Sequence, residues 1–234
     1  MKTNPTGTIL LVEDEPHIRK FLRISLEAHG FTVLEARLAN DGLQLCVNEK
    51  PDLIILDLGL PDLDGKEFIG RLREWSLVPI IVLSVRSDEA EKVTSLDAGA
   101  NDYMTKPFGI SELMARIRVL LRNRENDGQD ENSIYEHADL RVDLATRTVT
   151  LKGQMLHLSR KEYDLLKLFL SHPGQVLTHQ QILHEVWGPS REHETHHLRV
   201  LVGHLRQKLG DAPAKPRYIL TEQGVGYRLL AGTY

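Results

Sequence analysis

Residues 53–65 read LIILDLGLPDLDG, and this stretch decides the fold. Leu53–Leu56 is a short and wholly apolar run, which is typical of a strand buried on both faces of a parallel sheet. Asp57 follows the run directly, and Gly65 begins a helical pattern that continues to Leu72. A buried strand, a loop and a helix in this order indicate an α/β fold.

The same alternation continues on both sides of this stretch. Further strands are expected at 8–12, 31–34, 80–83 and 102–104, and further helices at 16–29, 38–47, 89–98 and 110–121. Five strands that alternate with five helices predict a doubly wound, five-stranded parallel sheet with helices on both faces.

The composition changes after this pattern ends. Of the 234 residues, 29 are Lys or Arg and 33 are Asp or Glu. Residues 125–138 contain five acidic residues and no Lys or Arg, whereas residues 139–234 contain 13 basic and nine acidic residues. A polar, acidic stretch without helical period is typical of a flexible linker. We therefore expect one domain at 1–124, a flexible acidic linker at 125–136 and a second domain at 137–234.

Several classes of protein are excluded by composition. Hydrophobic residues make up 41% and charged residues 26%, as in ordinary globular domains. No run of about 18 apolar residues exists, so we expect no membrane contact. The polar start Met1–Gly7 does not resemble a signal peptide, and one cysteine, Cys46, cannot form an internal disulfide. These features favour a cytoplasmic protein.

Reactive side chains follow four of the five expected strands. The carboxyl ends of parallel strands meet at one edge of the sheet, where doubly wound folds bind their ligands. Clustered carboxylates repel one another unless a cation is present, and Mg²⁺ is the divalent ion that most commonly accompanies such oxygen ligands. A carboxylate beside such an ion can accept a phosphoryl group, whose charge an ammonium group would stabilise. The residues at this edge are Glu13, Asp14, Asp57, Ser84 and Lys106.

Four segments at this edge resemble the landmarks of a two-component receiver domain, a flavodoxin-like fold. They are LLVEDE (10–15), LDLGLPDLDG (56–65), VLSVRS (82–87) and GANDYMTKPF (99–108). The resemblance covers residues 8–122. It implies that a sensor histidine kinase phosphorylates Asp57.

The resemblance also assigns the other residues of the site. It implies that Mg²⁺ is held by Asp57, by Asp14 directly, by Glu13 through water and by the backbone carbonyl of Gly59. Lys106 would contact the phosphoryl group, Ser84 would bond one of its oxygens, and Tyr103 would be the switch residue that moves with Ser84. The Lys106–Pro107 bond would be cis.

A set of charges follows in the last part of this domain. In OmpR/PhoB-type regulators, matching residues form ion pairs between two receivers across a two-fold axis. By this resemblance, phosphorylation would produce a homodimer with three pairs: Lys92 with Glu112, Asp97 with Arg118, and Asp102 with Arg116.

The second domain has a different pattern. Alternating residues predict strands at 140–143 and 148–151, and capping-box sequences predict helices that begin after Ser159 and Thr178. A third helix is expected at about 194–209, followed by a hairpin of strands 218–220 and 226–230.

The third helix has one apolar stripe, and its opposite face is unusual. Glycine costs about 1 kcal/mol in a helix interior, so Gly203 on that face indicates that another molecule comes close. Arginine, histidine and glutamine can donate hydrogen bonds to base edges in a major groove. We expect DNA contacts from His196, His197, Arg199, Val200, Gly203, His204, Arg206 and Gln207, and from Arg228 in the hairpin.

Three segments of this domain resemble the output domain of OmpR/PhoB regulators. They are VLTHQQILHEVWG (176–188), HLRVLVGHLRQKLG (197–210) and YILTEQGVGYRL (218–229). The resemblance covers about 137–231 and implies a winged helix-turn-helix α+β domain that binds double-stranded promoter DNA. The whole chain would be a phosphorylation-controlled transcription regulator and not an enzyme.

Two other functions stay open at this point. The first is an Asp-nucleophile, Mg²⁺-dependent phosphatase, although Gly59 stands where the second acid of such enzymes belongs. The second is a phosphorelay regulator that acts through protein contacts without DNA. A minor alternative is that His193, His196 and His197 bind a metal ion.

Overall fold

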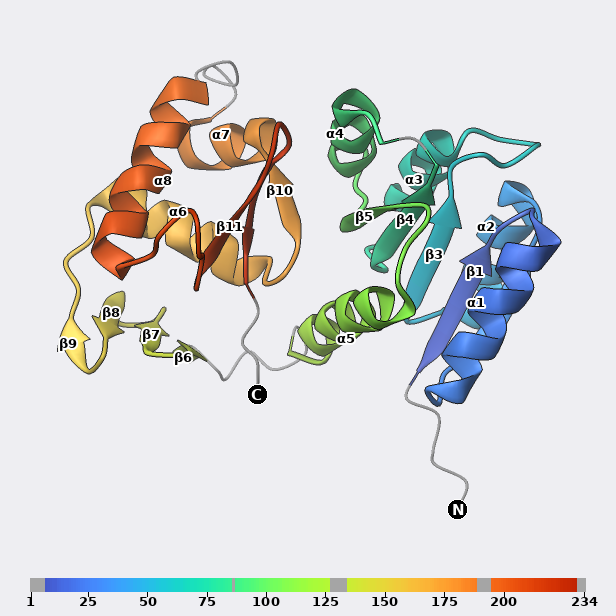
Figure 1. The fold of residues 1–234 in the computed structure, drawn as a ribbon, viewed down its shortest axis with the longest axis horizontal. Coiled ribbons are helices and arrows are strands. Elements are labelled where there is room, and N and C mark those ends of the chain that lie inside the picture. The colour runs from blue at the N-terminus through green and yellow to red at the C-terminus, as the bar shows by residue number, and fades with distance from the viewer. Residues whose placement is uncertain (1–6, 86, 127–133, 189–194, 231–234) are drawn as a thin grey trace. The chain divides into compact units, whose positions relative to one another are not determined.

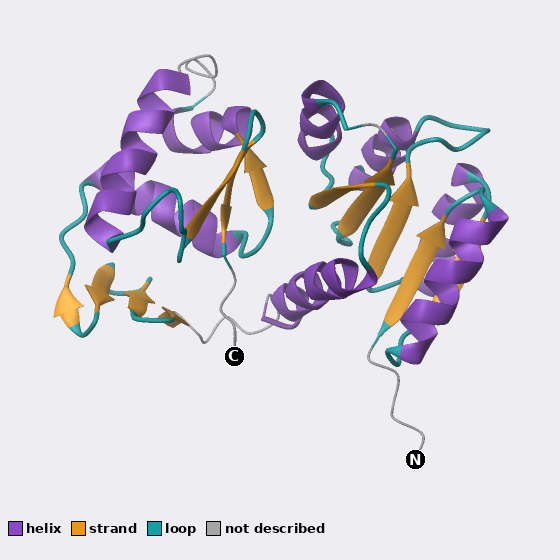
Figure 2. Cartoon of the chain, in the orientation of Figure 1, coloured by secondary structure: helices purple, strands orange, loops and turns teal. Residues whose placement is uncertain are grey.

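The computed structural model describes residues 7–85, 87–126, 134–188 and 195–230. The chain divides into two compact units, Met1–Leu121 and Arg122–Tyr234. Figure 1 labels the elements of both units, and Figure 2 separates their helices from their strands. Among the described residues, no helix is both long and apolar enough to cross a lipid bilayer.

The first unit has a five-stranded sheet in the order β2-β1-β3-β4-β5. All four strand pairings are parallel, which confirms the predicted doubly wound sheet. The strands are β1 (Thr8–Val12), β2 (Thr32–Ala36), β3 (Leu53–Asp57), β4 (Ile80–Ser84) and β5 (Asp102–Thr105). The helices are α1 (Pro16–Ala28), α2 (Ala39–Glu49), α3 (Gly65–Arg73), α4 (Glu89–Asp97) and α5 (Ile110–Asn126).

Apolar side chains on both faces of the sheet hold these helices. On one face, Leu11 and Ile55 of the sheet pack with Leu22 of α1 and Leu113 of α5. Helices α2, α3 and α4 form a row of neighbours in which α2 contacts α3 and α3 contacts α4. Cys46 of α2 is buried, and burial raises the pKa of its thiol to about 12. Because every strand of the sheet runs the same way, the carboxyl ends of the strands meet at one edge.

The second unit combines two antiparallel sheets with three helices. One sheet has the order β6-β7-β8-β9 and the other the order β10-β12-β11. The strands are β6 (Ile134–His137), β7 (Leu140–Asp143), β8 (Thr148–Leu151), β9 (Gln154–Met155), β10 (Val176–Thr178), β11 (Ile219–Glu222) and β12 (Gly226–Leu229). The helices are α6 (Arg160–Ser171), α7 (His179–Trp187) and α8 (Thr195–Leu209). This arrangement is the winged helix-turn-helix expected from the sequence.

Both predicted capping boxes are present. The hydroxyls of Ser159 and Thr178 accept the amides of Glu162 and Gln181, whose side chains in turn accept the amides of the two caps. Helix α5 continues to Asn126 and β6 begins at Ile134, so both elements enter the expected linker. The rest of that linker, residues 127–133, lies outside the described residues.

The hairpin of β11 and β12 is the wing, and one of its glycines is required because the backbone of another strand comes very close. Gly226 of β12 pairs with Thr178 of β10. A Cβ atom built on Gly226 would lie 1.9 Å from the carbonyl oxygen of Leu177 and 2.9 Å from Cα of Thr178. The wing can therefore pair with β10 only if residue 226 has no side chain.

Candidate functional site

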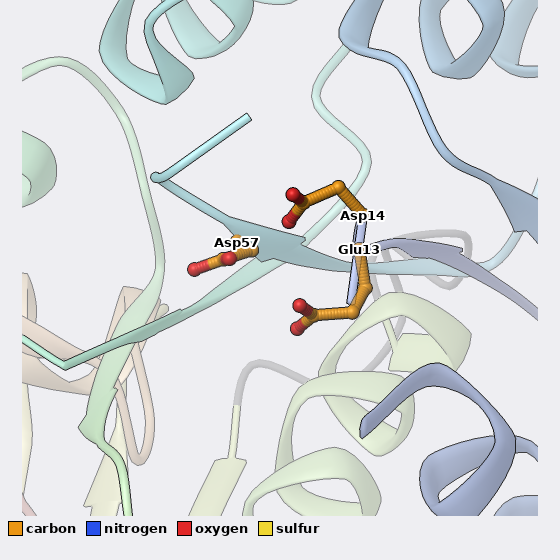
Figure 3. A group of neighbouring side chains, drawn as sticks. All are labelled: Glu13, Asp14 and Asp57. Atoms are coloured by element: carbon orange, nitrogen blue, oxygen red, sulfur yellow. The ribbon is translucent and has the colours of Figure 1, made fainter. Parts of the chain in front are cut away.

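Three carboxylates meet at the carboxyl edge of the five-stranded parallel sheet. Glu13 and Asp14 follow β1, and Asp57 is the last residue of β3. One oxygen from each lies within 4.8 Å of the others, and Figure 3 shows the three side chains beside one another. Glu13 is fully buried and Asp57 is 8% exposed. The predicted convergence of these residues is thus present in the structure.

Lys106 joins this cluster from the loop after β5. Its Nζ lies 2.9 Å from Oε2 of Glu13 and 3.3 Å from Oδ2 of Asp57. Burial raises the pKa of Glu13 to about 7, and the nearby charge of Asp57 adds to the rise although Lys106 opposes it. One ammonium group therefore does not offset three carboxylates at such short distances. The set of hard oxygen donors fits a divalent cation such as Mg²⁺.

A buried arginine, Arg19, which the sequence analysis missed, holds the backbone of Glu13 and Asp14. Nη1 of Arg19 donates hydrogen bonds to the backbone carbonyls of Glu13 (2.7 Å) and Asp14 (3.0 Å). Nε of Arg19 lies 3.2 Å from a carboxylate oxygen of Glu35 on β2. The arginine thus fixes the turn after β1, and its position in the first turns of α1 gave no signal of this role.

The remaining predicted residues of the site lie where their strands end. Ser84 ends β4 and is 3% exposed, and its carbonyl accepts the amide of Lys106 at 2.7 Å. The Lys106–Pro107 bond is cis, as the resemblance implied. A Cβ built on Gly59 would lie 3.6 Å from Oδ2 of Asp57, so this loop passes directly beside the carboxylate. Tyr103 is 2% exposed, so its side chain is buried.

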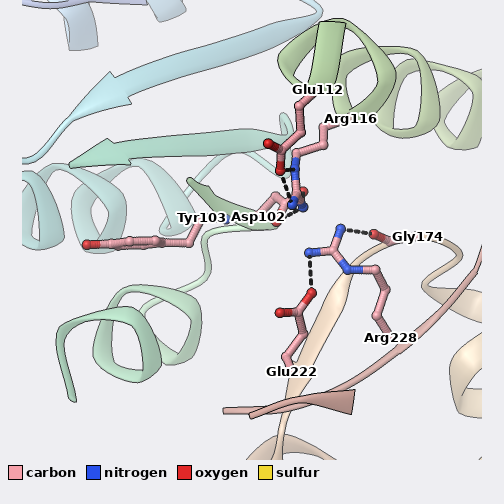
Figure 4. A network of polar contacts seen from close by, with 7 residues as sticks. All are labelled: Asp102, Tyr103, Glu112, Arg116, Gly174, Glu222 and Arg228. Atoms are coloured by element: carbon pink, nitrogen blue, oxygen red, sulfur yellow. Dashed lines mark hydrogen bonds and ion pairs between the residues drawn. The ribbon is translucent and has the colours of Figure 1, made fainter. Parts of the chain in front are cut away.

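The two residues of one pair expected between subunits, Asp102 and Arg116, are in contact within the chain. Nη1 of Arg116 lies 2.8 Å from Oδ2 of Asp102, and Nη2 lies 2.6 Å from Oε1 of Glu112 (Figure 4). Asp102 is 2% exposed, so its carboxylate is not available at the surface. Burial would lower the pKa of Arg116, but the two carboxylates raise it. Asp102 and Arg116 are thus in contact within one chain, and the same pair between two subunits stays a prediction.

The predicted DNA-contact face of α8 is exposed to solvent. Its apolar stripe is buried, and Val200 on the other face is 42% exposed. A Cβ built on Gly203 would meet no atom of the chain within 4 Å, so nothing inside the protein requires a glycine there. The exposed residues of this face are His196, His197, Arg199, Val200, Gly203, His204 and Gln207.

Arg206 does not belong to this face. Its Nη2 donates to the carbonyl of Ile219 at 2.6 Å and to Oγ1 of Thr221 at 2.9 Å, and the residue is 8% exposed. Arg206 follows Val202 by four residues, which places it on the flank of the buried stripe. It fastens α8 to strand β11 of the wing, and we withdraw it from the DNA-contact set.

Arg228 is also occupied inside the domain. Its Nη1 donates to the carbonyl of Gly174 at 2.8 Å, and its Nη2 lies 3.2 Å from Oε1 of Glu222 (Figure 4). The residue is 8% exposed. Its guanidinium therefore stabilises the wing, and the expected phosphate contact is withdrawn as well.

A buried aspartate at the end of α8 is a second residue that sequence analysis missed. Oδ1 of Asp211 accepts the amide of Arg217 at 2.6 Å, and Oδ2 accepts that of Ile219 at 2.9 Å. Asp211 thereby shapes the loop from α8 to β11. A single charged residue after a helix has no sequence pattern that reveals such a role.

His196 and His197 lie in the first turn of α8 and, among the described residues, belong to no group that could hold a metal ion. The rings of His196 and His197 lie 6.2 Å apart, and His193 lies outside the described residues. Among the described residues, the acidic cluster of Glu13, Asp14 and Asp57 is the one group whose ligand atoms are close enough to hold a metal ion.

Comparisons with known proteins agree with both halves of this description. Residues 9–118 match the model of the response regulator receiver domain, and residues 153–229 match that of the transcriptional regulatory protein C-terminal domain. The KDP operon transcriptional regulatory protein KdpE of Escherichia coli (strain K12) is 51% identical over 222 residues, which are 95% of this chain and 98% of that protein. KdpE of Mycobacterium tuberculosis is 42% identical over 223 residues, 95% of this chain and 99% of that protein. A solved structure of a RitR mutant is 31% identical, covers 96% of this chain and 99% of that chain, and has a TM-score of 0.50.

Proposed function

Because the chain belongs to the OmpR/PhoB family of response regulators, we propose that it receives a phosphoryl group on Asp57 from a sensor histidine kinase and then dimerises on promoter DNA. The family makes the chain a transcription factor and not an enzyme with a substrate of its own. The observation that carries the proposal is the position of Lys106 between Glu13 and Asp57, in a cluster of three carboxylates.

The residues of the cluster divide the chemistry among them. A carboxylate oxygen of Asp57 forms a bond to phosphorus while the P–N bond of the kinase phosphohistidine breaks, and the imidazole leaves with the electron pair. Lys106 donates to the transferred group and neutralises part of its charge. Asp14, Glu13, Asp57 and the Gly59 carbonyl would hold Mg²⁺, which when bound neutralises charge on the phosphoryl oxygens. Ser84 bonds one of these oxygens.

The signal then passes to the face of α4, β5 and α5. Phosphorylation adds nearly two negative charges and three acceptor oxygens. Movement of Ser84 toward them changes the space available to Tyr103, which is the proposed switch. On that face, we propose three pairs between two receivers: Lys92 with Glu112, Asp97 with Arg118, and Asp102 with Arg116.

We infer that the target is the promoter of a potassium-transport operon. The motifs DLGLPDLDG (57–65) and GHLRQKLGDAPAKPRYILTEQGVGYR (203–228) resemble KdpE, and the 51% identity with the KDP operon regulator of E. coli supports the same target. The test is a gel-shift titration with the chain's own potassium-operon promoter and a scrambled duplex, before and after treatment with phosphoramidate and Mg²⁺. We expect phosphorylation to tighten binding to the promoter alone. Equal affinity for both duplexes would contradict the target, and no binding to either would favour a regulator that acts without DNA.

Gly203 provides a test of the DNA surface. Gly203→Glu should abolish promoter binding in the gel shift, because it places bulk and negative charge on the open face of α8 against phosphates and base edges. Gly203→Ala should stabilise the helix by about 1 kcal/mol and still weaken binding. Gly70→Glu is the matched control, since a Cβ on Gly70 of α3 also meets nothing within 4 Å. The DNA surface is elsewhere if Gly203→Glu binds as tightly as this control.

Charge reversal tests the dimer. Arg118→Glu should weaken the phosphorylated dimer by about tenfold, because each pair occurs twice across a two-fold axis and exposed pairs contribute about 0.2–1 kcal/mol each. Asp97→Arg in the same chain should restore much of the affinity. Sedimentation equilibrium with and without phosphoramidate measures both. Unchanged dimerisation in the single variant would exclude the Asp97–Arg118 pair.

A further inference from the structure

The loop after β3 lies beside the carboxylate of Asp57. Its second residue, Gly59, lies beside the carboxylate: a Cβ built there would be 3.6 Å from Oδ2 of Asp57. Gly59 is also the residue whose carbonyl we assign to the divalent cation. A shift of this loop would therefore move a proposed ligand while leaving the three carboxylates in place.

Helix α2 begins without a capping side chain of its own. Its N-cap is Leu38, which cannot accept a hydrogen bond through its side chain. The first amides of a helix have no partner within the helix and need an acceptor from elsewhere. In this chain the acceptor is Asp62 of the loop after β3. Its Oδ1 accepts the amide of Ala39 at 2.9 Å, and its Oδ2 accepts the amide of Asn40 at 3.0 Å and Nδ2 of Asn40 at 2.9 Å.

These donors favour the charged form of the carboxylate. Burial alone would raise the pKa of Asp62, but hydrogen bonds from Asn40 and Ala39 lower it below its ordinary value. Both oxygens of Asp62 are thus committed to α2, and the residue is not a member of the acidic cluster.

Helix α2 is itself a rigid support for the site. A Cβ built on Gly42 would lie 3.0 Å from Cγ2 of Val12 and 3.2 Å from Cε2 of Phe68, so α2 is in close contact with β1 and α3. Val12 is followed directly by Glu13. The helix therefore packs against the base of one acidic strand end, and through Asp62 it also holds the loop that follows Asp57.

The segment between Gly59 and Asp62 is short and stiff. Leu60 is 8% exposed and is anchored by burial. Pro61 has a φ angle that its ring fixes, which restricts how this segment can bend. Only these two residues separate Asp62 from Gly59.

We propose that Asp62 is a positioning residue of the phosphorylation site, which fastens the loop after β3 to the first turn of α2 and so holds the Gly59 carbonyl in place for a divalent cation. This inference rests on the proposed function, because it concerns the cation of that site.

The test is a calorimetric titration of the full chain with Mg²⁺ alone. Asp62→Ala should weaken Mg²⁺ binding by about tenfold, the lower end of the range for groups that orient metal ligands. Asp62→Asn keeps one acceptor and loses the charge, so its affinity for Mg²⁺ should lie between that of the parent chain and that of Asp62→Ala. Hydrogen exchange at the amides of Ala39 and Asn40 should become faster in Asp62→Ala, which shows directly that the fastening is lost.

Asp41→Ala is the matched control, because Asp41 is an exposed carboxylate in the first turn of the same helix. It removes the same charge without touching the loop and should leave Mg²⁺ affinity within twofold of the parent chain. The inference is overturned if Asp62→Ala binds Mg²⁺ like the parent, or if Asp41→Ala weakens binding equally. If the parent chain neither binds Mg²⁺ nor takes up phosphate from phosphoramidate, the proposed function fails instead. Should Asp62→Ala not fold, the comparison of Asp62→Asn with Asp41→Asn decides in the same way.

Discussion

Asp57→Asn should reduce phosphate incorporation from phosphoramidate and Mg²⁺ to an undetectable level. The amide cannot form the acyl phosphate, and no other carboxylate of the cluster occupies the end of β3. The fold should stay intact, because Lys106 keeps its 2.9 Å contact with Glu13 and one repulsive charge is removed from the cluster. Intact-mass spectrometry measures the phosphate, and thermal unfolding measures the stability.

Asp41→Asn is the control for this substitution, since it makes the same chemical change at an exposed carboxylate of α2. It should be phosphorylated as fully as the parent chain. Hydroxylamine-sensitive phosphate on the Asp57→Asn variant would place the acceptor at another residue. If phosphoramidate also fails to raise the promoter affinity of Asp57→Asn, phosphorylation of Asp57 and DNA binding are connected as proposed.

Gly226→Ala should produce the largest loss of stability. The added Cβ would lie 1.9 Å from a backbone oxygen and 2.9 Å from Cα of Thr178, and neither is the flexible end of a side chain. Strands β10 and β12 would have to separate at the pair Thr178–Gly226. We expect a cost of about 3 kcal/mol, the upper end for overpacking. For a unit of this size, that lowers the midpoint of thermal unfolding by about 12–24 °C.

Differential scanning calorimetry of the full chain measures this effect. Gly203→Ala is the appropriate control, because the same methyl group there meets no atom within 4 Å and should leave the midpoint unchanged or slightly higher. If the free energy of unfolding of Gly226→Ala lies within about 1 kcal/mol of that of the parent chain, the pairing of β10 with β12 is not as described.

Regular elements could be predicted from the sequence where apolar residues have a strong pattern. The run Leu53–Leu56 and its equivalents identified every strand of the parallel sheet. Strands β9 and β10 were missed because they have two and three residues, too few for alternation to be visible. Strand β6 was missed because most of it lies in the polar stretch that was assigned to the linker. The end of α5 was predicted at residue 121, five residues too early, because the polar residues after Leu121 continue the helix without an apolar stripe.

Site residues could be predicted where a regular element places them, and not where their contacts depend on packing. Glu13, Asp14, Asp57 and Lys106 were found because parallel strands bring their carboxyl ends together, whatever the details of packing. Arg206 and Arg228 were assigned to DNA wrongly, because residue type alone does not distinguish an exposed guanidinium from one bonded to backbone carbonyls. Helix-to-loop contacts were not predictable at all, since their partners are far apart in the chain.

The cap of α2 has a consequence for the way the receiver folds. Asp62 follows Ala39 by 23 residues, so a nascent chain that ends before the loop after β3 lacks the acceptor for the first amides of α2. The start of this helix therefore gains its full stability only after β3 has been added to the sheet. Opening of that loop should in turn release the first turn of α2, so the two behave as one cooperative unit in native-state exchange. A deletion or insertion between Gly59 and Asp62 would then destabilise the first turn of α2, although it changes no residue of that helix.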